Sequence, residues 1–372
     1  MKKTIKLFSL TFIVLTIWLS GCTPPQTPTS SPIDNSEIIT PTGSIMTDAH
    51  SNKISEDRML LVLSAPSIHD EYYKPAFQRI VDFQISYANA IMGNDNVIII
   101  VDKDTKPSYE SQLPEDILIT AEVYDIWMRD FTTVNPLESV QFTYTWASMT
   151  KQESKEVQNS FADFADQYDI QRHPTDLLID GGNIVDNYAG KIITTTRFME
   201  DNNLSYEEAV EELSDLLGAT EVAILEPDEE VLAHSDGMVS WIDEDVLLVN
   251  DYSSDPAFRN LVMDELLAAF PATTIIEVPV EYTTNPPGEW DGFESACGVN
   301  LNSTVTFKNI YVPVFNMPHD QAAIDLIKEN TTKKVIPINA EAVCPMGGSV
   351  RCLTWQLTGA NAEKLILAAR EK

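Results

Sequence analysis

The sequence is poor in positive charge. Lys and Arg together number 24, against 57 Asp and Glu, and the formal net charge is −33. A surface this acidic repels nucleic acids and anionic lipids, so a nucleic-acid partner is not expected. The same acidity favours cationic ligands, although a simple need for solubility outside the cell explains it equally well.

Cysteine and histidine are also scarce. The chain has 4 Cys and 5 His, with neither a Cys-x-x-Cys pair nor a His-rich cluster, so no metal site is predicted. The four cysteines are Cys22, Cys297, Cys344 and Cys352. If Cys22 is modified, three remain, and an odd number outside the cytoplasm leaves at least one free thiol. Cys297 and Cys344 could pair with each other, but nothing in the sequence fixes that pairing.

The apolar run over residues 7–18 is too short to span a bilayer comfortably. It follows a lysine-rich start and is typical of a secretory signal. It ends in Leu19-Ser20-Gly21-Cys22, which resembles the lipobox of bacterial lipoproteins. That resemblance implies a signal peptide over 1–21, cleavage before Cys22 and a diacylglyceryl group on its sulfur. The expected location is the bacterial cell envelope, outside the cytoplasm and anchored to the membrane by this lipid. An ordinary secretory peptide with an incidental cysteine is the alternative.

A second composition change follows the signal segment. Residues 22–56 are rich in Thr, Pro and Ser, with almost no apolar clustering, and are predicted to form a disordered tether. No second Pro/Ser-rich linker follows. Residues 57–372 are therefore predicted to be one catalytic domain, and a chain with 44% hydrophobic residues can bury a substantial core there.

Strand-like and helix-like patterns alternate along this domain, which predicts an α/β fold. In its first part, strands are expected over 59–63, 97–101, 117–120 and 140–146, with helices over 73–92 and 155–168. A strand-strand-helix-strand unit then recurs at least three times, within 177–225, 238–278 and 304–338. The strands expected in these units include residues 183–185 and 304–307. The helix of the first unit opens with the capping box Ser205–Glu208. Radial repetition of such a unit would make a propeller, which hides sheet edges and leaves one central pit.

Polar motifs interrupt the apolar pattern at several turns, where binding residues are common. They include a thiol, an imidazole and three carboxylates, in the segments Trp127-Met128-Arg129-Asp130, Asp180-Gly181-Gly182-Asn183, His234-Ser235-Asp236 and Gly347-Gly348-Ser349-Val350-Arg351-Cys352. Paired carboxylates suit the planar fork of a guanidinium group. A thiolate can attack the guanidinium carbon, and an imidazole can protonate the departing nitrogen. Each motif alone has a plain structural explanation, such as a turn, an ion pair or a buried cysteine.

In this order, from Val123 to Gln356, the motifs resemble the agmatine deiminase and bacterial (Porphyromonas-type) peptidylarginine deiminase family, within the guanidino-group-modifying superfamily. The family's fold is a five-bladed α/β propeller. The resemblance implies that Cys352 is the nucleophile, with His234 as general acid and then base. Asp130 and Asp236 would hold the guanidinium, Asp180 would orient His234, and Trp127 and Asn302 would contact the substrate. It implies hydrolysis through a covalent amidino-thioether, with no metal or organic cofactor.

Some positions depart from the family pattern. Arg351 precedes the nucleophile where agmatine deiminases typically carry His, and Phe131-Thr132-Thr133 replaces a small Gly-Pro pair. Residues 142–146 contain no arginine, which a peptidylarginine deiminase would be expected to use for a C-terminal carboxylate. Together with the acidity, this favours agmatine or another small cationic guanidine as substrate.

Three alternatives remain open from the sequence. A peptidylarginine deiminase would make citrulline in peptides or proteins. A cysteine protease or amidase would use Cys352 and His234, but it would not need two further carboxylates near the sulfur. A non-catalytic lipoprotein that binds a cationic solute would tolerate Cys352→Ala.

Overall fold

The computed structural model describes residues 50–145, 149–285, 290 and 294–371. The predicted signal peptide over 1–21, Cys22 and the predicted tether up to residue 49 lie outside this part of the chain. The last residues assigned to the tether do pack against the domain. Asn52 is buried and exchanges two hydrogen bonds of 2.8 Å with the backbone of Val97. Asn52, which lies before the predicted boundary at residue 57, thus contacts the domain because its polar side chain pairs with a strand.

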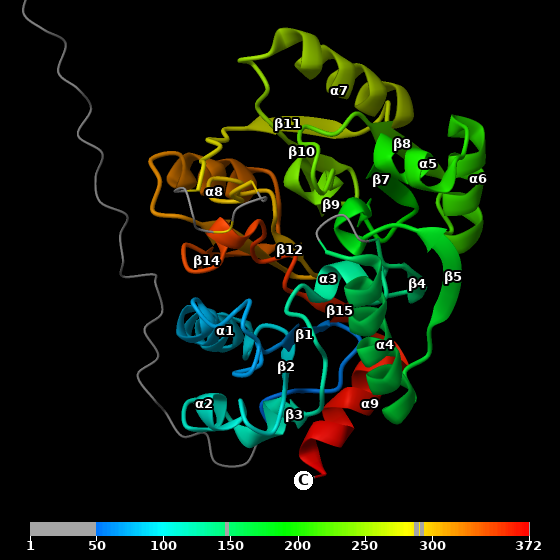
Figure 1. Cartoon of the computed structure of the whole chain (residues 1–372). Helices are drawn as coiled ribbons and strands as arrows, with labels where there is room; N and C mark the ends of the chain where they lie inside the picture. Colours follow the sequence, from blue (N-terminus) through cyan, green and yellow to red (C-terminus); the bar gives the residue numbers. More distant parts are fainter. Residues whose placement is uncertain (1–49, 146–148, 286–289, 291–293, 372) are drawn as a thin grey trace, which may run out of the picture. The chain divides into compact units, whose positions relative to one another are not determined.

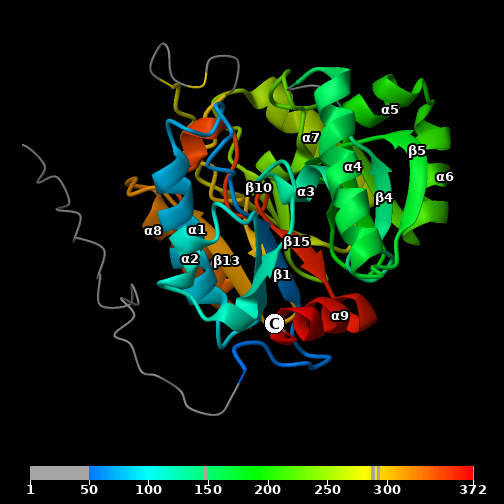
Figure 2. The same ribbon diagram turned by 60° about the horizontal axis from the view of Figure 1, so that its bottom comes forward.

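The described residues form five separate sheets with helices around them, as Figures 1 and 2 show. The N-terminal part of the chain forms, in order, β1 (Leu60–Ser64), α1 (Phe77–Ile91), β2 (Asn96–Val101), α2 (Pro107–Glu110), β3 (Leu118–Thr120), α3 (Met128–Phe131), β4 (Val140–Thr143), α4 (Lys151–Gln167) and β5 (His173–Leu178). Strands β1, β2 and β3 belong to the first sheet, and β4 and β5 form the second. The next three sheets contain β6 (Val185–Asp186), β7 (Lys191–Thr195), α5 (Thr196–Asn202), α6 (Tyr206–Leu217), β8 (Glu221–Leu225), β9 (Val239–Asp243), β10 (Val246–Asn250), α7 (Pro256–Ala269), β11 (Thr274–Val278), β12 (Thr304–Val305), β13 (Asn309–Val314), α8 (Asp320–Glu329) and β14 (Lys334–Asn339). The chain ends with β15 (Trp355–Leu357) and α9 (Gly359–Arg370). This arrangement confirms the predicted α/β class.

The predicted strand-strand-helix-strand unit is present in three successive sheets. In each, the first strand pairs antiparallel with the second, and the second pairs parallel with a third strand after a helical crossover. The sheets are β6-β7-β8, β9-β10-β11 and β12-β13-β14. A parallel pair needs such a crossover because its strands run in the same direction. The repeated pattern in the sequence therefore reflects one local topology used several times.

The first sheet has the same pattern but takes its antiparallel strand from the other end of the chain. β15 pairs antiparallel with β1, with Leu60 opposite Leu357, and β1 pairs parallel with β2. Every residue of β1 and β2 is buried, as expected for strands covered on both faces. The C-terminal segment thus joins the N-terminal sheet, and Cys352, three residues before β15, is fixed by this pairing.

Local signals explain where several helices begin. Ser205 and Glu208 form the predicted reciprocal capping box at the start of α6, and Gly218 ends that helix with a positive φ of 64°. Helix α4 begins at Lys151, four residues before the predicted start, because Thr150 and Glu153 form a second capping box. Helix α5 was not predicted, since it directly follows β7 without a turn signal.

Three predicted strands are shorter in the structure. The strand expected over 140–146 ends at Thr143, where the pairing with β5 is irregular, and residue 146 lies outside the described residues. The segment expected as a strand over 183–185 begins with the 3-10 turn η3 (Gly181–Asn183), and only Val185 and Asp186 pair. The strand expected over 304–307 ends at Val305.

The polar motifs lie in the links between successive sheets. Trp127 and Asp130 lie between β3 and β4, Asp180 between β5 and β6, and His234 and Asp236 between β8 and β9. Asn302 and Cys352 lie in the next two links, before β12 and β15. One functional segment per link brings side chains from all five sheets to one place.

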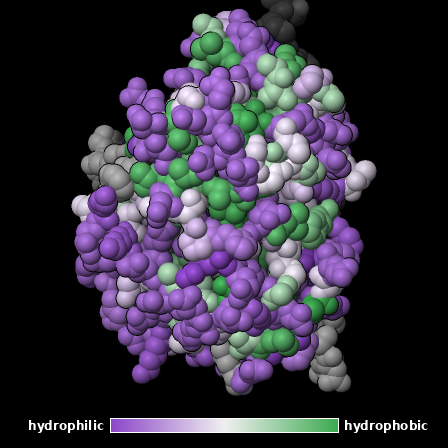
Figure 3. Space-filling view, turned by 90° about the vertical axis from the view of Figure 1, so that its right-hand side faces the viewer, coloured by the Kyte–Doolittle hydropathy of each residue, from purple (hydrophilic) through white to green (hydrophobic). Residues whose placement is uncertain are grey.

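One face of the molecule illustrates how polar and apolar residues are distributed on its surface. Figure 3 shows a mostly hydrophilic face with scattered apolar residues, in keeping with the excess of acidic side chains. Within residues 50–371, as far as the structure describes them, no helix is long and apolar enough to cross a membrane.

Candidate active site

Cys352 presents a buried thiol at the end of a glycine turn. The 3-10 turn η5 (Cys344–Met346) ends at Gly347, whose φ of +92° is in the region that favours glycine. Only 6% of the Cys352 surface is exposed, and its sulfur is a thiol that takes no part in a disulfide. Cys297 and Cys344, whose pairing the sequence left open, form a disulfide.

Asn302 holds the loop that carries the thiol. Its Nδ2 lies 3.1 Å from Cys352 Sγ and is placed to donate to it. Its Oδ1 accepts a hydrogen bond of 2.9 Å from Ser349 Oγ and one of 3.2 Å from the Arg351 backbone N–H. One buried amide therefore connects the link before β12 to the thiol and to the turn in front of it.

His234 lies between two carboxylates. Its Nε2 is 3.2 Å from Asp180 Oδ2, and its Nδ1 is 3.9 Å from Asp130 Oδ1. Asp180 is itself fixed by Thr145, whose backbone N–H and hydroxyl each donate a hydrogen bond of 2.8 Å. The backbone N–H of Gly182 donates to Asp130 Oδ1 at 3.0 Å. The imidazole therefore has a defined orientation before any substrate binds.

Two glycines make these close approaches possible. A Cβ on Gly182 would lie 2.5 Å from His234 Nδ1 and 2.8 Å from Asp130 Oδ1. A Cβ on Gly348 would lie 2.5 Å from the Trp127 ring and 3.0 Å from Cys352 Cβ. The Gly-Gly pairs in the sequence thus mark places where backbone packs directly against functional side chains.

Asp236 faces the thiol from the other side and is already paired within the protein. Its Oδ2 lies 3.8 Å from Cys352 Sγ and accepts a hydrogen bond of 2.8 Å from Arg351 Nη1. The second guanidinium nitrogen of Arg351 donates to the Ile184 carbonyl at 2.6 Å. In the sequence, Arg351 stood out only as an unusual residue next to the nucleophile, because no local pattern indicated its pairing with Asp236. Arg129 is not paired with Asp130; it binds Gln356 Oε1 at 2.5 Å.

Burial and the three carboxylates set the protonation of the site. Burial alone lowers the pKa of His234, but Asp130, Asp180 and Asp236 outweigh it and raise that pKa to about 10. Burial, followed by the charges of Asp236 and Asp130, raises the pKa of Cys352 well above its usual value. Burial also raises the pKa of Asp130, against the attraction of His234. At neutral pH these shifts favour an imidazolium at His234 and a protonated thiol at Cys352 before substrate binds.

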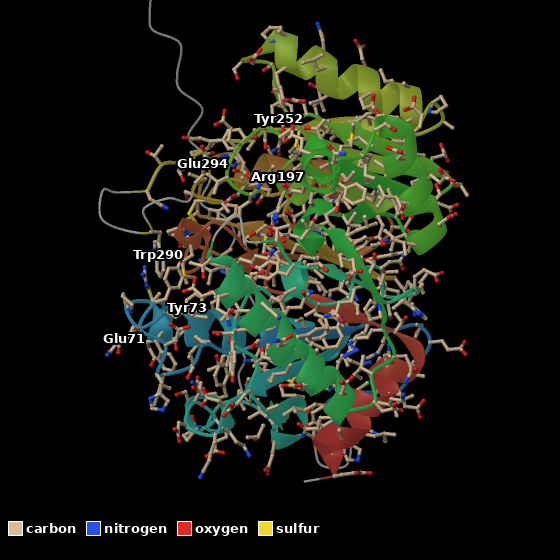
Figure 4. The ribbon with its side chains drawn as sticks, turned by 45° about the vertical axis from the view of Figure 1, so that its right-hand side comes forward. Glu71, Tyr73, Arg197, Tyr252, Trp290 and Glu294 are labelled. Atoms are coloured by element: carbon tan, nitrogen blue, oxygen red, sulfur yellow. A yellow bond between two sulfur atoms is a disulfide. The ribbon has the colours of Figure 1, made fainter. Side chains whose placement is uncertain are left out.

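Two cavities meet at Cys352 and His234. The larger, of about 450 Å³, also contains Asp236, Asn302, Gly237 and Tyr252, and we call it the Tyr252 chamber. The smaller, of about 330 Å³, also contains Trp127, Asp130, Asp180 and Tyr73, and we call it the Trp127 chamber. Figure 4 shows Tyr252 and Glu294, from the first, above Tyr73, from the second.

All seven predicted site residues of the domain line at least one chamber: Trp127, Asp130, Asp180, His234, Asp236, Asn302 and Cys352. Among the described residues that line the two chambers, none is Lys or Arg, whereas acidic residues occur in both. This lining is suited to a cation. No three His, Cys, Asp or Glu side chains in the described part of the chain are grouped to hold a metal ion.

Several lining residues were not found by sequence reasoning. In the Trp127 chamber, Tyr73 donates a hydrogen bond of 2.6 Å to Asp125. In the Tyr252 chamber, Tyr252 and Tyr282 both donate to Asp228 Oδ2, at 2.7 Å and 2.8 Å. These residues are isolated in the sequence, and only the fold brings them together.

Residues 55–357 match the family model described as Porphyromonas-type peptidyl-arginine deiminase. The chain belongs to this family. A search of curated proteins gave no match.

Solved structures with a similar fold include several deiminases. Agmatine deiminase from C. jejuni has 16% sequence identity and a TM-score of 0.68, with 83% of this chain and 96% of that chain covered. A cysteine-to-serine variant of that enzyme with substrate bound has 15% identity and a TM-score of 0.67, with 83% and 96% covered. Agmatine deiminase from Enterococcus faecalis has 17% identity and a TM-score of 0.66, with 81% and 93% covered. At these identities the likeness shows the fold.

Proposed function

We propose that this protein is a hydrolase that deiminates a small cationic guanidine, such as agmatine, to its ureido product and ammonia. The observation that carries the proposal is the junction of the two chambers. There a buried thiol lies beside Asp236, and an imidazole lies between Asp130 and Asp180. A protease needs the thiol and the imidazole, but two further carboxylates next to them serve a positively charged reacting group.

Binding of the substrate would activate the nucleophile. Burial, and after it the carboxylates of Asp236 and Asp130, hold the pKa of the Cys352 thiol high before substrate binds. A guanidinium placed between the two carboxylates neutralises this negative field and favours the thiolate, and the thiol releases its proton to solvent because His234 is already protonated. Cys352 Sγ then attacks the guanidinium carbon and forms a tetrahedral adduct. Activation would thus depend on a cationic substrate, which limits reaction with neutral electrophiles.

His234 would supply and recover a proton. Its raised pKa keeps it protonated at neutral pH, so it can protonate the departing nitrogen and release ammonia. The neutral imidazole then takes a proton from water, and the resulting hydroxide attacks the amidino carbon. The proton taken from water restores the imidazolium. Collapse of the hydroxyl adduct then expels the Cys352 sulfur, which takes up the hydroxyl proton, and gives the ureido product and the free thiol. Asp180 would keep the ring in position through the contact at Nε2.

The Trp127 chamber would hold the substrate chain. It combines aromatic walls, including Trp127 and Tyr73, with acidic groups such as Asp70 and Glu153. An aliphatic chain can pack against the rings, and a terminal ammonium is attracted by ring faces and carboxylates. The described lining offers no Lys or Arg for a carboxylate, so agmatine fits better than free arginine.

A peptidylarginine deiminase is the second candidate, because the family model that matches carries that description. The decisive experiment compares agmatine, arginine, a peptide with C-terminal arginine and one with internal arginine. Ammonia and ureido product are measured for each, with Cys352→Ala as the control. We expect product from agmatine and none from the variant. Product from peptides alone would replace the substrate assignment. No product from any guanidine would favour a non-catalytic, solute-binding lipoprotein.

We further propose that the protein is anchored outside the cytoplasm by a lipid on Cys22. The lipobox-like sequence before Cys22 supports this, and so does the Cys297–Cys344 disulfide, since disulfides persist mainly in oxidising compartments. In cells fed labelled palmitate, we expect label on the wild-type chain and on Cys352→Ala, but not on Cys22→Ala. Equal labelling of the Cys22 variant would refute the anchor.

The five sheets also support a finer proposal for the fold. We infer that they are the blades of a five-bladed pseudo-symmetric propeller, because three share one complete unit and the first is completed by the C-terminal strand. Each link between sheets contributes one segment to the site, as a radial arrangement would require.

A further inference from the structure

We propose that the active site also cleaves guanidines that carry a substituent on the leaving nitrogen, and releases an amine in place of ammonia. The proposal rests on the proposed deiminase function. Its substrates would be N,N′-disubstituted guanidines in which the second substituent is aliphatic and ends in a cation. The observation that carries it is the Tyr252 chamber, which shares Cys352 and His234 with the Trp127 chamber.

The two carboxylates that face the guanidinium lie in different chambers. Asp130 lines the Trp127 chamber and Asp236 lines the Tyr252 chamber, whereas Cys352 and His234 line both. The reacting carbon must sit about 3–3.5 Å from the sulfur, at the junction. The three nitrogens of a planar guanidinium diverge from that carbon. When the substrate's first aliphatic chain lies in the Trp127 chamber, a second guanidinium nitrogen of the substrate therefore points into the Tyr252 chamber.

The Tyr252 chamber is larger than ammonia requires. Its volume of about 450 Å³ falls in the range of roughly 300–1,000 Å³ found for small-molecule sites. Its walls include the apolar side chains of Val231, Leu232, Val299 and Phe258. Such walls suit a methylene chain on the leaving nitrogen.

Asp228 is placed to receive the cationic end of such a chain. The hydroxyls of Tyr252 and Tyr282 both donate to its Oδ2, and Glu294 and Asp255 line the same space. The neighbouring Glu229 accepts hydrogen bonds from the backbone N–H groups of residues 231 and 232, so it serves the loop instead. An ammonium beside Asp228 would interact with several acidic groups at once.

The chemistry balances without any further reactant. Cys352 Sγ forms a bond to the guanidinium carbon, and the bond from that carbon to the substituted nitrogen breaks. His234 gives its proton to this nitrogen, which leaves as a primary amine through the Tyr252 chamber. Water then hydrolyses the amidino-thioether as before, and the ureido product forms from the chain in the Trp127 chamber.

The test compares agmatine with the symmetric N,N′-bis(aminobutyl)guanidine on the full-length protein. Either orientation of the symmetric compound gives the same products if the inference holds: diaminobutane and ureidobutylamine in equal amounts. We expect this pair at a kcat/KM within about tenfold of that for agmatine. Ammonia and the disubstituted urea, or no product while agmatine is hydrolysed, would overturn the inference. Failure of both compounds would instead refute the proposed deiminase function.

Two variants test whether the Tyr252 chamber holds the leaving group of the symmetric compound. Gly237 lines this chamber, and a Cβ added there meets no atom within 4 Å, so Gly237→Leu fills space without a clash at Cβ. We expect Gly237→Leu to keep agmatine turnover and to lower kcat/KM for the symmetric compound by about tenfold or more. Asp228→Asn should raise KM for the symmetric compound more than for agmatine. Equal effects on both compounds would show that the chamber does not hold the leaving group.

Discussion

Replacing Asp236 with asparagine should increase the reactivity of the Cys352 thiol toward a neutral alkylating agent. The carboxylate lies 3.8 Å from the sulfur. At that distance, with an effective dielectric constant of about 20, a carboxylate and a thiolate repel each other by about 4 kcal/mol. Removing this repulsion lowers the thiol pKa and raises the thiolate population by about three orders of magnitude.

Two effects reduce the change in rate. A thiolate of lower pKa is a weaker nucleophile, which removes roughly half of the gain on a logarithmic scale. Arg351, 2.8 Å from the same carboxylate, already offsets part of the repulsion. We therefore expect iodoacetamide to alkylate Cys352 faster in Asp236→Asn than in the wild type at pH 7.5, by about tenfold and by no more than about 30-fold.

The assay follows the peptide that contains Cys352 by mass spectrometry, without a guanidine present. Asp228→Asn is the matched control, because Asp228 lines the same chamber but its carboxylate is bound by the hydroxyls of Tyr252 and Tyr282. Its alkylation rate should equal that of the wild type. The wild-type rate should keep rising with pH beyond 9, since the thiol pKa is raised. An unchanged rate in Asp236→Asn, or a wild-type plateau below pH 8, would refute the electrostatic reasoning.

Three further results are expected. Gly182→Ala places a Cβ 2.5 Å from His234 Nδ1 and should lower kcat by about 100-fold while the melting temperature stays near that of the wild type; retained activity would show that the imidazole can move. Reducing the Cys297–Cys344 disulfide, which spans 47 residues, should lower the free energy of unfolding by about 4 kcal/mol in the chain-entropy model, measured by denaturant titration. Ser205→Ala removes the N-terminal cap of α6 and should lower the free energy of unfolding by about 1 kcal/mol, with no change in turnover.

Features encoded locally were predictable from the sequence. The capping box at Ser205 and the alternation of buried strands and helices depend on neighbours a few residues apart, and the structure contains them. The start of α4 was predicted too late, although Thr150 and Glu153 carried a readable signal. The packing of Asn52 against Val97 had no such signal, because its partner is 45 residues away.

The site was predictable as a set of residues but not as a geometry. The order of the motifs indicated which side chains to consider, and in the structure each of them lines at least one of the two chambers that share Cys352 and His234. The pairing of Arg351 with Asp236 joins residues 115 positions apart, and no local pattern encodes it. The same holds for the tyrosines around Asp228. Such contacts depend on how separate sheets approach one another.

The covalent step is the central claim of this account, and trapping the intermediate tests it most directly. Wild-type protein is mixed with agmatine, and the reaction is quenched in acid during turnover. The protein is then digested, and the mass of the peptide that contains Cys352 is measured by mass spectrometry. We predict a mass increase equal to agmatine less one ammonia on Cys352, absent when Cys352→Ser is treated in the same way. Ammonia release with no modified Cys352 at any time, together with turnover by Cys352→Ala, would contradict the account.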